Sequence, residues 1–480
     1  MELNNELKEY IVGRQRNLKY LLRDVNNLHH RSEFFKIKKY LDDFISGKSI
    51  ESRFIAMPGL RGVGKSTIVL QLINYLLKEQ NINSQNVLYL SMDEVVTFFK
   101  ANLLEAVDNY LDFVHKTNKM AVNKKIFIFI DECQTDSKWA ISGKILYDNS
   151  KNIFLICTGS SAIDLEINSD VARRVYKETI YPCNFRDHIL LKHHISTDYE
   201  FSKTLENIIC LGEDKYLDEA IDLEEKVYDK VYNLKNNPKR EFLDFLKTYG
   251  FPFSLNLKED ISYERTYTVI EKVIEKDIPA IKNFNTSTNP SISRIIKYIA
   301  LSRNELISNT KIANYLSLSS KLVHEVLNTL EKTQLIFSIK PYAGIAKIIR
   351  KPWKYYFLSP SLKSSINFRL GRFNLDNERC LGALAENYVA SKLYQMSKTS
   401  FPSMGVFYPT EKKGVDFLLR TKLDDIVPVE VGIGKKTKSQ LTLAINNYNA
   451  DYGVLISNRY SEIRKHKNII HIPLTSFGFL

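Results

Sequence analysis

The sequence predicts an α/β protein whose core is a parallel sheet, followed by helical and smaller α/β domains. Two observations support this class. A short apolar run passes directly into a glycine-rich loop and an amphipathic helix over residues 53–80. Two further apolar runs, at residues 126–130 and 152–158, end in acidic or small polar residues. Apolar runs of this length, separated by helical patterns, are typical of parallel strands covered on both faces.

Length and composition limit the alternatives. At 480 residues the chain is expected to divide into roughly three domains of ~100–200 residues each. A content of 44% hydrophobic and 26% charged residues indicates a globular chain and excludes a disordered one. We find no apolar run near the ~20 residues of a membrane helix and no signal-peptide core, and therefore expect a cytoplasmic protein without membrane contact. The five cysteines lack zinc spacing and are interpreted as structural.

The charge balance indicates the partner. A net charge of +13 and a pI near 9.1 favour a polyanion, and we expect nucleic acid, with DNA the first candidate. The alternative is a compositional one, because the chain is rich in Asn and Ile, a bias in which lysine often rises without function.

The first motif follows the apolar run Arg53–Pro58 and precedes the helical pattern STIVLQLINYLLKEQ. It comprises Gly59, Leu60, Arg61, Gly62, Val63, Gly64, Lys65, Ser66 and Thr67. This is the pattern G-x-x-x-x-G-K-[ST] in the strand–loop–helix context that a P-loop requires. We expect its backbone N–H groups to surround the phosphates of ATP, Lys65 to reach the β- and γ-phosphates, and Ser66 to hold Mg²⁺. A chance glycine turn is the alternative.

A second acidic strand accompanies the loop. Ile126–Ile130 is continuously apolar, as in a central parallel strand, and Asp131 and Glu132 follow at its end. Asp131 is expected to coordinate Mg²⁺ through water, and Glu132 to polarise the water that attacks the γ-phosphate. Two acids that merely cap a strand are the alternative.

The next strand carries candidates for sensing the γ-phosphate. Asn152–Thr158 is followed by Gly159 and Ser160, and in an AAA+-like sheet this strand end lies between the two motif-bearing strands. Thr158 and Ser160 are therefore expected to contribute to nucleotide binding. Further on, Arg173 or Arg174 would neutralise charge on the transferring phosphoryl group, and we select Arg174 as the catalytic candidate. Surface arginine in a loop is an equally good interpretation.

The middle of the chain is less informative. Asp218–Tyr232 and Lys239–Lys247 have amphipathic helical periodicity with solvated charged faces, and we interpret residues 201–290 as a helical lid. From residue 291 three helical segments precede two strand-like runs around a basic stretch, which predicts a winged helix over 291–370. Ser320, Lys321 and His324 would face a DNA groove, whereas many winged helices instead bind proteins.

Several segments together resemble a known family. The stretches GLRGVGKST, FIFIDECQ, ICTGSS, ARRV, YPCNFRDH, YGFP and KPWKYYF occur in the order found in archaeal-type AAA+-like ATPases of the STAND-related group. The resemblance covers the chain from about residue 10 to the end. It implies ATP binding, slow or regulated hydrolysis, and a C-terminal domain related to the PD-(D/E)xK nuclease fold.

The last hundred residues match that nuclease-like fold in element order. Glu386 lies in a periodic helix, and Asp416 and Glu430 lie on successive strands, where they would bind Mg²⁺ and activate water. Gly432 stands where the catalytic lysine is expected, two residues after Glu430 and on the same strand face. Lys435 or Lys436 would replace it only if the glycine-rich turn bends back.

These inferences combine into one hypothesis. We expect an ATP-hydrolysing regulatory ATPase coupled to DNA engagement through a winged helix and a degenerate nuclease-like domain. The alternatives are an ATP-gated Mg²⁺-dependent nuclease, and a non-nuclease switch acting on a protein partner or homo-oligomer. The expected segments are an N-terminal helical segment (1–48), an ATPase core (49–200), a lid (201–290), a winged helix (291–370) and a nuclease-like domain (376–480).

Overall fold

The computed structural model divides the chain into two compact units. The N-terminal unit comprises Met1–Tyr181 and Lys276–Asn283, and the C-terminal unit comprises Pro182–Glu275 and Phe284–Leu480. The structure describes residues 2–160, 167, 169–285, 288–302, 306–344, 351–372, 377–411, 414–421, 425–433 and 439–480. Within these ranges, none of the helices combines the length and the apolar character needed to cross a membrane.

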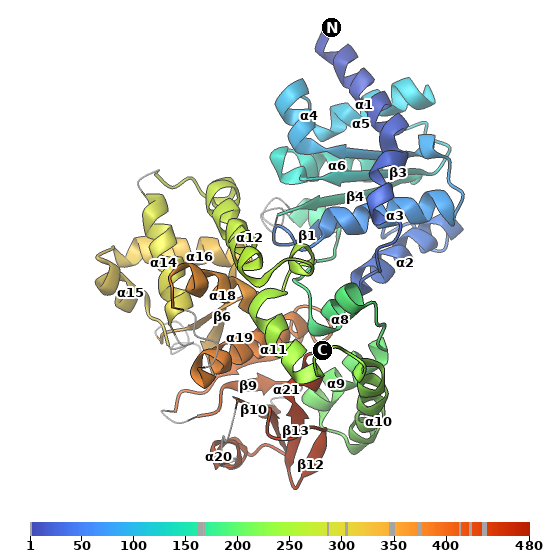
Figure 1. Cartoon of the computed structure of the whole chain (residues 1–480). Helices are drawn as coiled ribbons and strands as arrows, with labels where there is room; N and C mark the ends of the chain where they lie inside the picture. Colours follow the sequence, from blue (N-terminus) through green and yellow to red (C-terminus); the bar gives the residue numbers. More distant parts are fainter. Residues whose placement is uncertain are drawn as a thin grey trace. The chain divides into compact units, whose positions relative to one another are not determined.

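The N-terminal unit is a parallel sheet between helices (Figure 1). Its strands are β1 (Phe54–Pro58), β2 (Val87–Ser91), β3 (Ile126–Asp131), β4 (Ile153–Gly159) and β5 (Tyr176–Lys177). Its helices are α1 (Glu2–Leu21), α2 (Ser32–Ser46), α3 (Lys65–Lys78), α4 (Met92–Phe99), α5 (Leu103–His115), α6 (Trp139–Asn149), α7 (Ser169–Ala172) and α13 (Ile278–Ile281). The strand order is β2-β3-β4-β1-β5, and every pairing is parallel. The predicted α/β class with a parallel sheet core is confirmed.

Strand β3 shows why these residues form a central strand. All six of its residues are buried. Ile128 belongs to the core cluster that includes residues of α1, α5 and α6, whereas Phe127 packs on Phe44 of α2 with ring centroids 5.7 Å apart. Because side chains alternate between faces, a strand buried on both sides must be apolar throughout, as this one is.

The C-terminal unit combines helices with a mixed sheet. Its helices are α8 (Phe185–His193), α9 (Tyr199–Leu211), α10 (Asp214–Val231), α11 (Pro238–Thr248), α12 (Glu259–Lys272), α14 (Asn289–Leu301), α15 (Asn309–Leu316), α16 (Ser320–Lys332), α18 (Pro360–Arg369), α19 (Glu378–Met396), α20 (Ser439–Asn447) and α21 (Leu474–Phe477). Its strands are β6 (Ile336–Pro341), β7 (Lys354–Phe357), β8 (Gly405–Tyr408), β9 (Phe417–Arg420), β10 (Ile426–Gly432), β11 (Gly453–Ser457), β12 (Arg464–His466) and β13 (Ile469–Pro473). They form one sheet in the order β12-β13-β11-β10-β9-β8-β6-β7.

One sheet joins two segments that the sequence suggests are separate. Strands β6 and β7 form an antiparallel hairpin after α14, α15 and α16. The end of β6 also pairs in parallel with β8, through Lys340 with Phe407 and Pro341 with Tyr408. The hairpin therefore continues the sheet that carries Asp416 and Glu430 at β9 and β10.

The chain terminus packs against the segment YPCNFRDH. Asn184 caps α8 and its side-chain amide donates to the carbonyl oxygen of Leu480 at 3.0 Å. Phe185 lies in an aromatic cluster with Phe242 and Phe479, at ring-centroid distances of 5.1 Å from each. The quoted motif thus has a packing role that joins α8, α11 and the last residues of the chain.

Glu224 on α10 is a buried carboxyl group that links three segments. It accepts a hydrogen bond from the backbone N–H of Ile463 at 2.7 Å and another from the Ser476 hydroxyl. Burial raises the pKa of Glu224 from 4.5 to about 7. The Glu224 carboxyl group therefore binds its proton more tightly in the folded state than in the unfolded state.

We predict that the C-terminal unit loses stability as pH rises. The contribution of Glu224 to the free energy of unfolding is fully present below about pH 4.5 and is lost as the pH rises through about 7. The change amounts to up to about 3 kcal/mol. Urea denaturation at pH 5 and pH 8 measures it, and Glu224→Gln should flatten the pH dependence. Glu219→Gln, an exposed site on the same helix, is the control. An equal pH dependence in wild type and Glu224→Gln would contradict the assignment.

Candidate functional site

The glycine loop between β1 and α3 has the backbone geometry of a phosphate cradle. Gly62 and Gly64 have φ of 81° and 98°, in the left-handed region that favours glycine. A Cβ on Gly59 would lie 2.4 Å from the carbonyl oxygen of Ile180, so the loop can pass there only without a side chain. Helix α3 begins at Lys65, and its N-terminus therefore faces the loop.

Lys65 lies inside this loop. Its ammonium donates to the carbonyl oxygens of Gly59 at 2.9 Å and Leu60 at 3.0 Å. Burial lowers the pKa of Lys65, while the neighbouring carboxylates of Glu132 and Asp131 oppose that effect. The ammonium is therefore held by backbone carbonyl oxygens, with two carboxylates nearby.

Asp131 connects the loop to the sheet. Its carboxylate accepts from the Ser66 hydroxyl at 2.6 Å, from the Tyr89 hydroxyl at 3.3 Å, and from the Thr158 hydroxyl. Strand β4, which ends at Thr158 and Gly159, lies between β1 and β3. Hydroxyl and carboxylate oxygens are the ligands that Mg²⁺ prefers, so Ser66 and Asp131 fit a magnesium ion beside the loop.

Glu132 is fixed by an arginine from the loop itself. The Nη1 of Arg61 lies 3.3 Å from both carboxylate oxygens of Glu132, and Gln134 donates to the same carboxylate. Glu132 has φ of 51°, an uncommon conformation for a residue with a side chain, of the kind that clusters at functional sites. The backbone N–H of Ser160 donates to Gln134 at 3.2 Å, which ties the end of β4 to this group.

A second carboxylate also binds Arg61. The Nε and Nη2 of Arg61 donate to one carboxylate oxygen of Asp277, at 3.1 Å and 2.9 Å. Asp277 stands 216 positions after Arg61 in the chain. Sequence reasoning assigned Arg61 to the loop but missed Asp277, because no local motif marks a partner so distant. The sequence shows a charged residue inside the glycine loop and an acid two residues before Pro279, in KDIPA, but nothing that pairs them.

Arg174 has different neighbours from those expected of a catalytic arginine. Its Nε donates to Asp148 at 2.8 Å, and its Nη1 lies 3.6 Å from Asp170. These contacts belong to the α6–α7 region. Arg61, in contrast, contacts Glu132 at the end of β3.

The acids that the sequence suggested for a nuclease-like site lie in the C-terminal unit. Asp416 accepts a hydrogen bond from the backbone N–H of Val431 at 2.8 Å, beside the buried Glu430. Glu386 accepts from the Tyr356 hydroxyl at 2.7 Å, and the Lys354 ammonium lies 3.4 Å away. No sequence pattern predicts that Lys354 lies beside Glu386, because the two residues belong to separate elements, β7 and α19.

Two further observations describe that site. Position 432 is the last residue of β10 and carries no side chain, while Lys435 and Lys436 lie outside the described residues. A metal ion needs several ligand atoms close together. Among the described residues, Glu386, Asp416 and Glu430 do not form a group whose ligand atoms all lie within 4.8 Å of one another.

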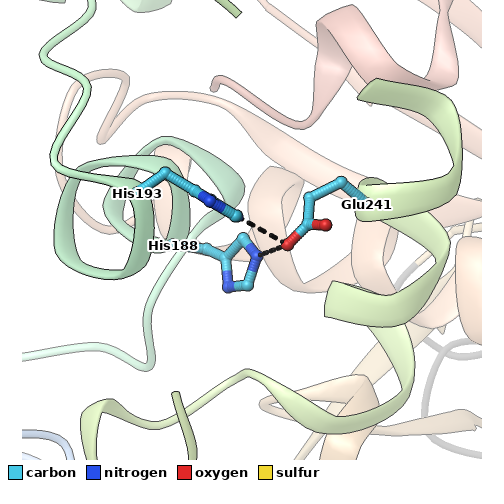
Figure 2. A group of neighbouring side chains, drawn as sticks. All are labelled: His188, His193 and Glu241. Carbon is cyan, nitrogen blue, oxygen red and sulfur yellow. Dashed lines mark hydrogen bonds and ion pairs between the residues drawn. The ribbon is translucent and has the colours of Figure 1, made fainter. Parts of the chain in front are cut away.

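A different group, His188, His193 and Glu241, does have its possible metal-ligand atoms within 4.8 Å of one another (Figure 2). Both imidazole Nε2 atoms lie 2.8 Å from the same Glu241 oxygen, and the Lys192 ammonium lies 2.9 Å from it. Burial lowers the pKa of His188 to about 4, so its ring is neutral at pH 7.

The group fits an ion-pair network better than a metal site. A metal bound at Nε2 of His188 would leave the proton on Nδ1, which is buried and has no partner among the described residues. Metal-ligating histidines normally donate that N–H, and burying it unpaired costs about 1–3 kcal/mol. The Lys192 ammonium would also repel a cation at the shared oxygen.

We predict that Glu241→Gln destabilises the C-terminal unit by about 3 kcal/mol, because it leaves buried donors without an ionised acceptor. Thermal and urea unfolding measure this, with Glu264→Gln on the exposed face of α12 as the control. Addition of Zn²⁺ or EDTA should leave the wild-type transition unchanged. Stabilisation by Zn²⁺ that disappears in His193→Ala would instead establish a metal site.

Three family models match the chain. Residues 51–189 match an AAA domain, residues 239–375 match a domain of unknown function (DUF8612), and residues 381–477 match another (DUF4143). The first match contains β1, the glycine loop, β3 and β4. The nucleotide-binding fold is therefore that of a P-loop ATPase.

Solved structures give weaker likeness. The Aeropyrum pernix ORC1 protein in complex with DNA is 10% identical with a TM-score of 0.32, covering 71% of this chain and 92% of that chain. AMPPCP-bound DnaA from Aquifex aeolicus is 16% identical with a TM-score of 0.26, covering 64% and 90%.

Two proteins of Methanocaldococcus jannaschii resemble the chain over most of its length. Uncharacterized protein MJ1544 is 23% identical over 420 residues, or 85% of this chain and 81% of that protein. Uncharacterized protein MJ1637 is 30% identical over 477 residues, or 99% of this chain and 94% of that protein. The chain therefore belongs to the same family as MJ1637, with an AAA domain at residues 51–189.

Proposed function

We propose that the protein binds and hydrolyses ATP and uses the nucleotide state to regulate engagement of DNA. The observation that carries the first part is the Ser66–Asp131–Thr158 network beside a buried Lys65, in a loop whose glycines leave room for phosphates. It supports a nucleotide site in which the loop lysine, the loop serine and the acid at the end of β3 lie within one group of contacts.

The residues have distinct roles in this proposal. Lys65 exchanges the carbonyl oxygens of Gly59 and Leu60 for the β- and γ-phosphate oxygens. Ser66 and Asp131 hold Mg²⁺, which would neutralise charge on the phosphates. Glu132 orients the attacking water once its carboxylate is free of Arg61. Thr158 and Ser160 place the end of β4 beside the γ-phosphate.

Two features support DNA as the output. The net charge is +13, and the exposed face of α16 carries Ser320, Lys321 and His324. The His324 ring lies 3.3 Å from the Asn309 amide and 3.0 Å from that of Asn328, which extends this polar face across α15 and α16. Three helices followed by a hairpin support a winged helix, whose second and third helices would carry the contact.

The nuclease-like acids favour binding over cleavage. The Asp416 carboxylate accepts from a backbone N–H, and Glu386 accepts from Tyr356 beside Lys354. Position 432, where the catalytic lysine is expected, is a glycine. We therefore propose a degenerate nuclease-like domain, with an ATP-gated nuclease as the alternative that active cleavage would establish.

We predict that Lys65→Ala loses ATP binding, because the phosphates lose their buried cation. Glu132→Gln should retain binding and lose hydrolysis by about 10²-fold. Nucleotide titration and phosphate release measure the two effects separately, and Lys48→Ala, an exposed lysine with a side chain 77% accessible, is the control. Hydrolysis unaffected by Glu132→Gln would contradict the assigned role.

We also predict DNA binding that changes with ATP and weakens as salt rises, as phosphate contacts require. Lys321→Glu should weaken binding about tenfold, whereas Lys215→Glu, at an exposed position of α10, should change it little. Fluorescence anisotropy with a labelled duplex measures affinity, and gels with Mg²⁺ or Mn²⁺ test cleavage. DNA affinity that is independent of both salt and ATP would remove the DNA part of the proposal.

A further inference from the structure

Arg61 occupies a position from which it can reach either protein or nucleotide. It lies between Gly59 and Gly62, in the loop whose carbonyl oxygens bind the Lys65 ammonium. Its Nη1 faces Glu132, the residue directly after Asp131, and Asp131 in turn binds Ser66. The guanidinium therefore lies at the end of the loop where a γ-phosphate would be bound.

Two carboxylates already use that guanidinium. Asp277 receives two of its N–H groups on one oxygen, at 2.9 Å and 3.1 Å, and Glu132 receives a third nitrogen at 3.3 Å. One positive charge is thus shared between two negative charges. An incoming γ-phosphate would meet repulsion from both carboxylates unless Arg61 turns toward it.

Asp277 makes that turn costly. Its side chain is 4% exposed, and burial raises the pKa of its carboxyl group. A buried carboxylate that loses its only arginine partner among the described contacts is strongly destabilised. Arg61 would therefore leave Asp277 only where its new bonds to an anion offset that cost.

The position of Asp277 in the chain connects it with the lid. It is the last residue of the π-helical turn Val273–Asp277, and α13 follows at Ile278. The segment Lys276–Asn283 belongs to the N-terminal unit, although the chain on both sides of it belongs to the C-terminal unit. π-Helical turns are rare and are frequently found at functional sites.

We propose that Asp277 is a positioning residue of the nucleotide site, and that Asp277 and the γ-phosphate of ATP compete for the Arg61 guanidinium. This inference rests on the proposed ATPase function. With the γ-phosphate bound, Arg61 contacts the phosphoryl oxygens and releases Glu132 to act on water. In the ADP state Arg61 returns to both acids, and the segment Lys276–Asn283 is again bound to the loop.

The competition predicts a change in discrimination between two nucleotides. Asp277→Asn removes the competing charge, so a non-hydrolysable ATP analogue should bind about tenfold more tightly, while ADP affinity changes less than twofold. Calorimetric titration gives both dissociation constants. Because neither measurement needs hydrolysis, the result is independent of the roles of Glu132 in catalysis.

Three variants separate this role from a structural one. Asp277→Glu keeps the carboxylate and should keep the wild-type ratio of the two affinities. Arg61→Ala combined with Asp277→Asn should lose the gain in analogue affinity. Asp108→Asn breaks the partly exposed pair with Lys119 and controls for the change in net charge. If Asp277→Asn fails to fold, Asp277→Ser carries the same expectation.

The outcomes are distinct. An unchanged or reduced preference for the ATP analogue in a folded Asp277→Asn protein overturns the inference and leaves the ATPase proposal intact. Wild-type protein that binds neither nucleotide overturns both. If the double variant Arg61→Ala, Asp277→Asn still binds the ATP analogue more tightly than the wild type does, the inference is also overturned, because the gain in affinity would then not involve the Arg61 guanidinium.

Discussion

The hydrogen bonds to the Asp131 carboxylate are the interaction on which the proposed nucleotide site depends. They join the start of α3 through Ser66, the strand β2 through Tyr89 and the strand β4 through Thr158. These donors meet one acid only because parallel register aligns the strands, with Ile130 opposite Cys157 and Met57 opposite Thr158. The apolar strand interiors fix that register, and the polar strand ends carry the chemistry.

The C-terminal unit uses buried acids for a different purpose. Glu241 connects α11 with α8, and Glu224 connects α10 with Ile463 and with α21. A buried carboxylate is tolerated only where enough donors reach it, so each one selects a single arrangement of its neighbouring elements. Apolar packing alone would permit small shifts between these helices. Such a shift would remove hydrogen-bond donors from a buried carboxylate and would therefore destabilise the fold.

Sequence reasoning recovered the local part of this molecule. The strand–loop–helix order and the fully apolar β3 follow from periodicity and from motif spacing, whereas the position of β4 between β1 and β3 was expected from the likeness to AAA+-like sheets. The partners of Arg61 and Glu386 could not be predicted that way. Asp277 and Lys354 reach them from distant parts of the chain, and a charged side chain in a helix or wing is usually solvated. Only the tertiary fold shows which of these charged side chains are buried and paired.

The pairing of β6 with β8 bears on how such chains can be divided. The family models separate residues 239–375 from residues 381–477, yet the sheet crosses that boundary at Lys340 and Pro341. A fragment ending between them would expose the edge of β6 in one piece and of β8 in the other, and open strand edges promote aggregation. The natural unit for expression and for evolutionary exchange is therefore the pair of segments together.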